Sequence, residues 1–139
     1  LYHTTHTNFN TKIINISGKT KEYFMLENIG HDGYQAGLDY LLGGNDNTSG
    51  IAIWHIDDNQ SNNGADVNHK LVDLEEAAEA GMDNSSHSGK QTNLYFSGNK
   101  TEFSDSTDPN SKTYSGTSSG ITINNISASG DSMTFDITF

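Results

Sequence analysis

The sequence predicts a mostly β protein, either an antiparallel sheet or a β-sandwich with long polar loops. Its apolar residues gather in short β-branched and aromatic runs, which long stretches of Asn, Ser, Gly, Asp and Thr separate. Disordered chains lack such runs, so a hydrophobic content of only 32% indicates a small core with long loops. With 139 residues and no internal repeat, we expect a single β-rich domain over residues 1–139.

Five segments carry strand signals, because each is rich in β-branched or aromatic residues and borders a turn signal: 11–17, 21–28, 50–57, 120–127 and 132–139. The second and third of these are apolar on both faces, which predicts central strands. The last alternates core-facing residues with polar ones, which is typical of an edge or surface strand: Met133, Phe135, Ile137 and Phe139. Residues 128–131 predict a hairpin turn between the last two strands.

Two further segments are ambiguous. Residues 69–77 combine helix-favouring Leu, Glu and Ala with a strand-like alternation, and we favour a strand. Residues 38–42 predict either a turn of helix or a brief strand between glycine-punctuated loops.

The composition excludes several classes of partner. The chain carries 18 acidic and 7 basic residues and a net charge of −11, so nucleic acid and anionic membrane surfaces would be repelled. This charge favours cations, or it serves only to keep a secreted protein soluble. The absence of Cys excludes disulfides and thiolate zinc sites. No apolar run approaches the roughly 20 residues of a membrane span.

Histidine offers little sign of catalysis. The six histidines include no HExxH pair, in which two His one helical turn apart grip zinc while the Glu activates water. His3 and His6 have a related spacing without the Glu. His55 lies in an apolar strand, where it is either a ligand or substrate contact or a hydrogen-bonded core histidine, and we favour the second interpretation.

The strongest chemical signal is a group of oxygen-bearing side chains around the loop that follows residues 50–57. Calcium takes six to eight hard oxygen ligands, and several carboxylates in one place are costly unless a cation neutralises them. We therefore predict a calcium site with the ligands Asp57, Asp58, Asp66, Asp73 and Glu75. The alternative is a solvated acidic surface, because no spacing here matches an EF-hand loop.

Five segments, taken in order, resemble the immune inhibitor A family of secreted bacterial zinc peptidases; the last two, residues 109–116 and 120–123, belong to one closing run. Residues 22–28 (EYFMLEN) are similar to the family's EYFLLENR strand, and residues 50–57 (GIAIWHID) to its GLLIWHID. Residues 72–77 (VDLEEA) are similar to its VDLEEADG, and residues 109–127 to its closing P-x-S, Y-x-G and SGI run. Ile29 stands where the family has Arg and Ala78 where it has Asp.

The resemblance implies a zinc peptidase whose HExxH helix lies upstream, outside this chain, and whose zinc-bound water attacks a peptide carbonyl. The present segment would be non-catalytic and would complete or buttress the fold. Its partners would be the upstream catalytic domain of the same polypeptide and, through it, protein substrates. The resemblance also implies calcium binding and an extracellular location. The start at Leu1 rather than Met fits this expectation of a longer polypeptide.

A second hypothesis is a free-standing, calcium-stabilised β-sandwich that binds glycan or protein. Aromatic rings stack on sugars and on apolar surfaces. The side chains that would supply such a platform are Trp54, Tyr34, Tyr40 and Tyr114.

Overall fold

The fold consists of strands joined by long loops. The computed structural model describes residues 2–4, 11–30, 49–63, 66–78, 82–83 and 89–139. Their strands are β1 (Tyr2–Thr4), β2 (Thr11–Asn15), β3 (Glu22–Ile29), β4 (Gly50–Asp57), β5 (Val72–Leu74), β6 (Thr122–Asn124) and β7 (Phe135–Thr138). A short 3₁₀ helix, η2 (Gln91–Asn93), lies between β5 and β6. Among these residues no helix has the length and apolarity of a membrane span.

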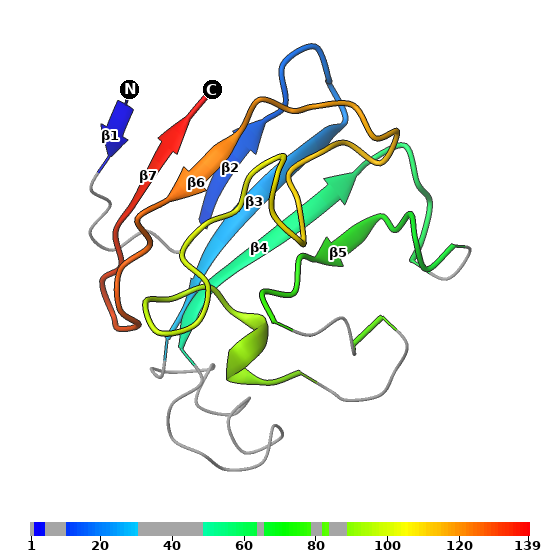
Figure 1. The fold of residues 1–139 in the computed structure, drawn as a ribbon. Coiled ribbons are helices and arrows are strands. Elements are labelled where there is room, and N and C mark those ends of the chain that lie inside the picture. The colour runs from blue at the N-terminus through cyan, green and yellow to red at the C-terminus, as the bar shows by residue number, and fades with distance from the viewer. Residues whose placement is uncertain (1, 5–10, 31–48, 64–65, 79–81, 84–88) are drawn as a thin grey trace.

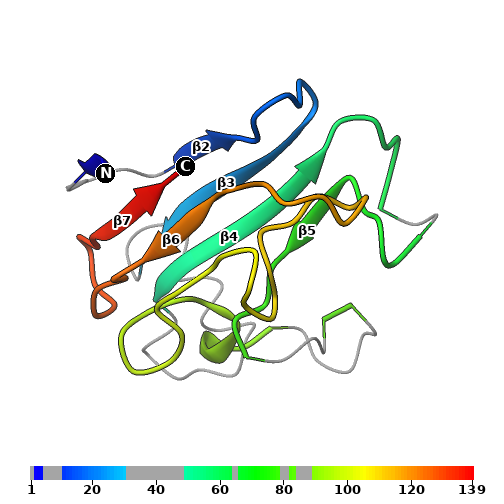
Figure 2. The same cartoon turned by 45° about the horizontal axis from the view of Figure 1, so that its top comes forward.

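The strands form two antiparallel sheets, so the antiparallel pairing is as predicted, and of the two predicted arrangements the chain has two sheets rather than one. The larger sheet has the order β2-β3-β4-β5, and the smaller has the order β1-β7-β6. Figures 1 and 2 show β6 and β7 lying in front of the larger sheet, on the same side as the loop that leads from η2 to β6. The mostly β fold class is therefore confirmed.

The core lies between the two sheets. Phe24 and Leu26 of β3 and Ile53 of β4 face inward, and all three are fully buried. Phe103, from the loop before β6, meets Phe24 edge to face at a ring-centroid distance of 5.2 Å, a favourable aromatic geometry. Alternate residues of the smaller sheet close the core from the other side: Ile123, Phe135 and Ile137. A period of two thus places the apolar side of each sheet inward.

The predicted central strands occupy interior positions. β4 has the predicted bounds of residues 50–57, and β3 differs from the prediction by one residue at each end. Both lie between neighbouring strands in the larger sheet. Only one face of β3 is fully buried, however, because Tyr23 and Met25 on its other face remain half-buried. The ambiguous segment 69–77 contains a strand, but that strand covers only β5, and residues 38–42 lie outside the described part of the chain.

The C-terminal hairpin is confirmed, with two corrections. β6 and β7 pair antiparallel around the predicted turn. β7 is not an edge strand, because β1, which the sequence did not predict, pairs with its other side. Phe139 was expected in the core but is 74% exposed, since the strand ends at Thr138 and the last residue leaves the sheet.

Asp105 organises the long polar loop before β6. Its carboxylate accepts hydrogen bonds from the Ser119 and Gly120 amides, both at 3.1 Å, and from the Ser111 and Ser118 hydroxyls. Burial opposes ionisation of this carboxyl group, but the hydrogen bonds outweigh it and lower the Asp105 pKa to about 2. One side chain therefore ties together loop segments that are up to 15 residues apart.

Candidate functional site

The most concentrated set of polar contacts in the core is centred on His55. This residue lies in β4 and is only 2% exposed. Its Nε2 atom is 3.1 Å from Glu22 Oε1, and its Nδ1 atom is 3.1 Å from Glu75 Oε1. His55 is therefore the hydrogen-bonded core histidine that the sequence favoured over an exposed ligand.

The local sequence explains how these side chains meet. In β3 the period of two puts Glu22 on the same inward face as Phe24, which is the register partner of His55. On the other side of β4, His55 pairs with Asp73, two residues before Glu75. Both neighbouring strands therefore direct a glutamate toward the imidazole.

Tyr114 extends this cluster toward the surface. Its ring stacks on His55 at a centroid distance of 4.1 Å and on His69 at 4.2 Å. Its backbone amide donates to Glu22 Oε1 at 2.7 Å. Burial, together with the charges of Asp73 and Glu75, raises the Tyr114 pKa, so the phenol stays neutral at physiological pH.

His69 links the cluster to the end of β4. Its Nε2 atom lies 2.7 Å from Asp57 Oδ2, while the other Asp57 oxygen accepts hydrogen bonds from the Asn59 amide and side chain. Burial works against ionisation of Asp57, but the hydrogen bonds from His69 and Asn59 outweigh it and lower the pKa of this carboxyl group. Asp57 is thus held as a carboxylate by donors of the protein itself.

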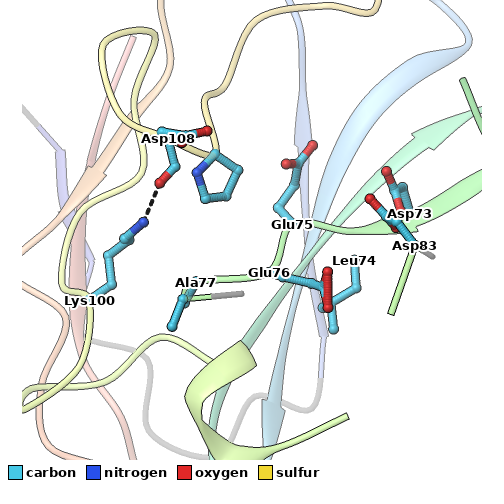
Figure 3. A pocket seen from close by; sticks show the side chains of 10 residues that line it. Asp73, Leu74, Glu75, Glu76, Ala77, Asp83, Lys100 and Asp108 are labelled. Carbon is cyan, nitrogen blue, oxygen red and sulfur yellow. Dashed lines mark hydrogen bonds between the residues drawn. The ribbon is translucent and has the colours of Figure 1, made fainter. Parts of the chain in front are cut away.

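A pocket of about 160 Å³ lies beside this cluster, along the chain that leaves β5 (Figure 3). Its walls are mainly acidic, with Asp73, Glu75, Glu76, Asp83 and Asp108 against the single cation Lys100. A second cation from outside the lining, Lys70, donates to both Asp73 and Asp83. Burial raises the Asp73 pKa, although its contact with Lys70 opposes the rise.

The five predicted calcium ligands are divided between different places. Asp73 and Glu75 line the acidic pocket, whereas Asp57 is engaged by His69 and Asn59 at the end of β4. Asp58 and Asp66 are exposed in the loop that follows. In the described residues, no three His, Asp or Glu side chains form a metal-binding group. Only the Asp73 and Glu75 part of the prediction has a shared cavity to support it.

The predicted aromatic platform is only partly described. Tyr34 and Tyr40 lie outside the described residues, as does His6. Trp54 is on the outer face of the larger sheet, where its Nε1 donates to Glu27 Oε2 at 3.1 Å. Tyr114 is instead stacked against two imidazoles inside the cluster. These two rings therefore do not share one surface.

Glu22 and Tyr114 are important members of the cluster that the sequence analysis did not assign to it. A signal for Glu22 was present, because the alternation that buries Phe24 and Leu26 also places this acid on the core face. Tyr114 had no such signal, since its loop is 92 residues away from Glu22 and only the folded chain brings them together.

Comparison of the chain with family models, with curated proteins and with solved structures gives no match. Arguments about its function therefore rest on the geometry of the cluster and on the ordered sequence motifs.

Proposed function

We propose that this chain is a non-catalytic segment of a secreted zinc metallopeptidase of the immune inhibitor A type, packed beside an upstream catalytic domain that cleaves proteins. The observation that carries this proposal is the origin of the His55 cluster. Four of the five segments that resemble the family each contribute one member, in chain order Glu22, His55, Glu75 and Tyr114. Motifs that are weak one by one thus form a single physical unit.

The contacts within the cluster explain why such motifs would occur together. Glu22 accepts hydrogen bonds from both the His55 ring and the Tyr114 backbone, so a change in one segment alters the contacts of two others. Buried polar groups are costly unless all are paired, which makes such a network an all-or-none feature. Four matching motifs are therefore more informative together than their separate lengths suggest.

The geometry favours a structural role for the cluster over a catalytic one. Glu22 and His55 are 6% and 2% exposed, so a peptide carbonyl has no direct access to them. A general base must come within hydrogen-bond reach of its substrate, and these groups already bond to each other. In this proposal zinc and its HExxH ligands belong to the upstream domain, and the present residues brace the fold.

Deletion of this segment from the parent protein tests the proposal. The parent reading frame should encode HExxH upstream, and its product should cleave a labelled denatured protein in the presence of zinc. We expect the purified chain of 139 residues to show no such cleavage. The parent without this segment should lose solubility or activity. Zinc-dependent proteolysis by the isolated chain, or a fully active deletion protein, would contradict the proposal.

Calcium is the second part of the proposed function. Asp73 and Glu75 lie in a pocket with three further carboxylates, and a cation would offset the repulsion among them. Asp73 and Glu75 themselves contact Lys70 and His55, so the shared pocket, whose lining does not include Asp57, Asp58 or Asp66, is what selects this place. We therefore place the proposed calcium at the acidic pocket, where loss of Asp73 and Glu75 should abolish its effect.

A further inference from the structure

The outer face of the larger sheet, which points away from the core, is apolar across all four strands. The pairing register aligns one residue from each strand in a continuous row: Ile13, Met25, Trp54 and Leu74. A second row, one step along the same face, contains Tyr23, Ile56 and Val72, with the polar Asn15 at its β2 end. Cross-strand neighbours of this kind form one contiguous surface.

Part of this surface is open to solvent. Ile13 is 55% exposed and Val72 is 36% exposed, while Met25, Trp54 and Leu74 between them are half-buried and Ile56 is buried. A single exposed apolar residue needs no explanation, but a row that runs across a whole sheet is typical of an interaction surface. This apolar row contrasts with the composition of the whole chain, of which only 32% is hydrophobic.

The charges at the border of this surface restrict what can cover it. Glu27 lies on the same face and accepts a hydrogen bond from Trp54, and Asp58 interacts with Tyr23 at the other end. On this face β2, β3, β4 and β5 carry no Lys or Arg, while the cation Lys21 lies directly before β3, where its carbonyl oxygen accepts a hydrogen bond from the Asp58 amide. A second copy of the chain would bring acidic borders together between two proteins of net charge −11. A complementary surface instead has an apolar centre with Lys or Arg at its edge.

We infer that the outer face of the larger sheet, centred on Ile13, Met25, Trp54 and Leu74, is the docking surface for the upstream peptidase domain. This inference rests on the proposed function, which supplies the partner. It adds the prediction that the partner presents an apolar patch bordered by basic side chains. The edge residues Ile13 and Val72 would become buried on docking.

Binding of the isolated chain to the separately expressed HExxH-bearing region of its parent tests this inference. Ile13→Asp and Val72→Asp place a charge within the contact, and each should weaken binding at least tenfold in calorimetry. Val67→Asp is the matched control, because Val67 is 56% exposed in the loop before β5, and it should change the affinity less than twofold. Circular dichroism and melting curves establish whether each variant is folded. If an aspartate variant does not fold, Ile13→Thr is measured in its place.

The outcomes separate the inference from the proposed function. Unchanged binding by both aspartate variants would overturn the inference while leaving a zinc peptidase parent intact. A wild-type dimer in light scattering that Ile13→Asp converts to monomer would also overturn it, because the occupant would be a second copy. Tight binding that depends on Ile13 and Val72, to an upstream region without peptidase activity, would support the docking surface and refute the proposed function.

Discussion

His55 illustrates how burial fixes the role of an ionisable side chain. In water its ring nitrogens would exchange partners freely, but in the core each is committed to one glutamate. Glu22 in turn depends on the imidazole, since a group that is this buried cannot turn to solvent for a substitute, whereas Glu75 has 14% of its side chain exposed and lines the acidic pocket. The contribution of His55 to the stability of the fold is therefore determined mainly by the carboxylates that would lose the imidazole as a partner.

The first prediction concerns this dependence. His55→Leu leaves Glu22 and Glu75 without their shared donor, so we expect a loss of about 3 kcal/mol in the free energy of unfolding. Urea denaturation measures this loss. His69→Leu is the control, because His69 is partly exposed and its partner Asp57 keeps the Asn59 donors; its cost should be less than half as large. Equal costs for both variants would contradict the importance assigned to the buried cluster.

Tyr95 gives the opposite expectation. The residue is fully buried, and its hydroxyl has no hydrogen-bond partner among the described residues. Burial and the charges of Glu75 and Asp108 raise its pKa, so the group stays neutral. Tyr95→Phe should therefore leave the stability unchanged or raise it by up to about 1 kcal/mol, since an unsatisfied buried hydroxyl is itself costly.

The control for Tyr95 is Tyr23→Phe, measured in the same urea titrations. The Tyr23 hydroxyl bonds to Asp58, so its loss should lower the stability slightly, by roughly 0.5–1 kcal/mol. A clear destabilisation by Tyr95→Phe would mean that the buried hydroxyl has a partner that the described contacts lack.

At this scale the sequence was informative about residue type and less so about partners. Burial of His55 followed from its position in an apolar run. Its glutamates could not be named, because they come from segments 33 residues before it and 20 residues after it. The sequence analysis also grouped Asp57 with Asp73 and Glu75 as calcium ligands because they are near one another in the sequence. That nearness did not specify which hydrogen-bond donors each carboxylate would meet in the folded chain.

At the scale of elements, the strength of the local pattern decided the accuracy of the prediction. Every residue of β4 is buried except the half-buried Trp54, and the bounds of the strand were predicted correctly. β5 has only three residues and sits at the edge of the sheet, where pairing with β4 determines its extent. β1 and η2 had no periodic signal, because both depend on contacts with distant parts of the chain.

Gly50 determines how closely β4 approaches the loop around η2. A Cβ atom at this position would lie 2.8 Å from Leu94 Cβ and 3.2 Å from the Tyr95 carbonyl oxygen. Gly50→Ala should thus push apart Ile51 and Tyr95, which form a two-way backbone bridge, and cost about 2 kcal/mol or more in urea denaturation. Gly130→Ala is the control, because its Cβ meets no atom within 4 Å, and it should change the stability by less than about 0.5 kcal/mol. Equal effects would argue against the close contact.

Asp105 predicts how the loop before β6 responds to acid. Its pKa is about 2 in the folded protein and 3.8 in the absence of such contacts, so the folded state favours the ionised form. This stabilisation is complete above about pH 5 and is lost as the pH falls through 4 toward 2. Asp105→Asn should be less stable than the wild type at pH 7 by about 1–2 kcal/mol, and the difference should shrink toward pH 2.

Melting temperatures between pH 2 and pH 7 measure the Asp105 contribution. Other carboxyl groups titrate in the same range, so the informative quantity is the difference between wild type and variant at each pH. Asp131→Asn, in an exposed turn, should follow the wild-type curve throughout. A difference for Asp105→Asn that does not depend on pH would show that the lost hydrogen bonds do not need the charge.

For the whole molecule, composition and alternation were enough to predict a mostly β protein with long polar loops, but they left one sheet and two packed sheets as alternatives. The sequence could not specify how the sheets are ordered. The pairing of β1 with β7 joins opposite ends of the 139-residue chain, and no local pattern records such a contact. The apolar outer face of the larger sheet had been interpreted as burial on both sides, whereas its two ends are exposed in this chain.

The proposed calcium site predicts a property of the entire fold. A ligand that binds only the folded state raises the melting temperature, so EDTA should lower it and added calcium should restore it. The combined Asp73→Asn and Glu75→Gln variant should lose this response, whereas Asp66→Asn, in the exposed loop, should retain it if the acidic pocket is the site. Identical wild-type melting curves with EDTA and with calcium would remove calcium from the proposal.

The smaller sheet has a consequence for the order of events during folding. Its central strand comes from the last five residues of the chain, and that strand pairs with one from the first four. The inward faces of β3 and β4 therefore stay uncovered until the end of the segment has left the ribosome. Closing such long loops carries an entropic cost before any contact repays it, which makes folding slow and places closure of the core after the synthesis of β7. Until then, the emerging larger sheet has two apolar sides that chaperones or neighbouring chains can reach.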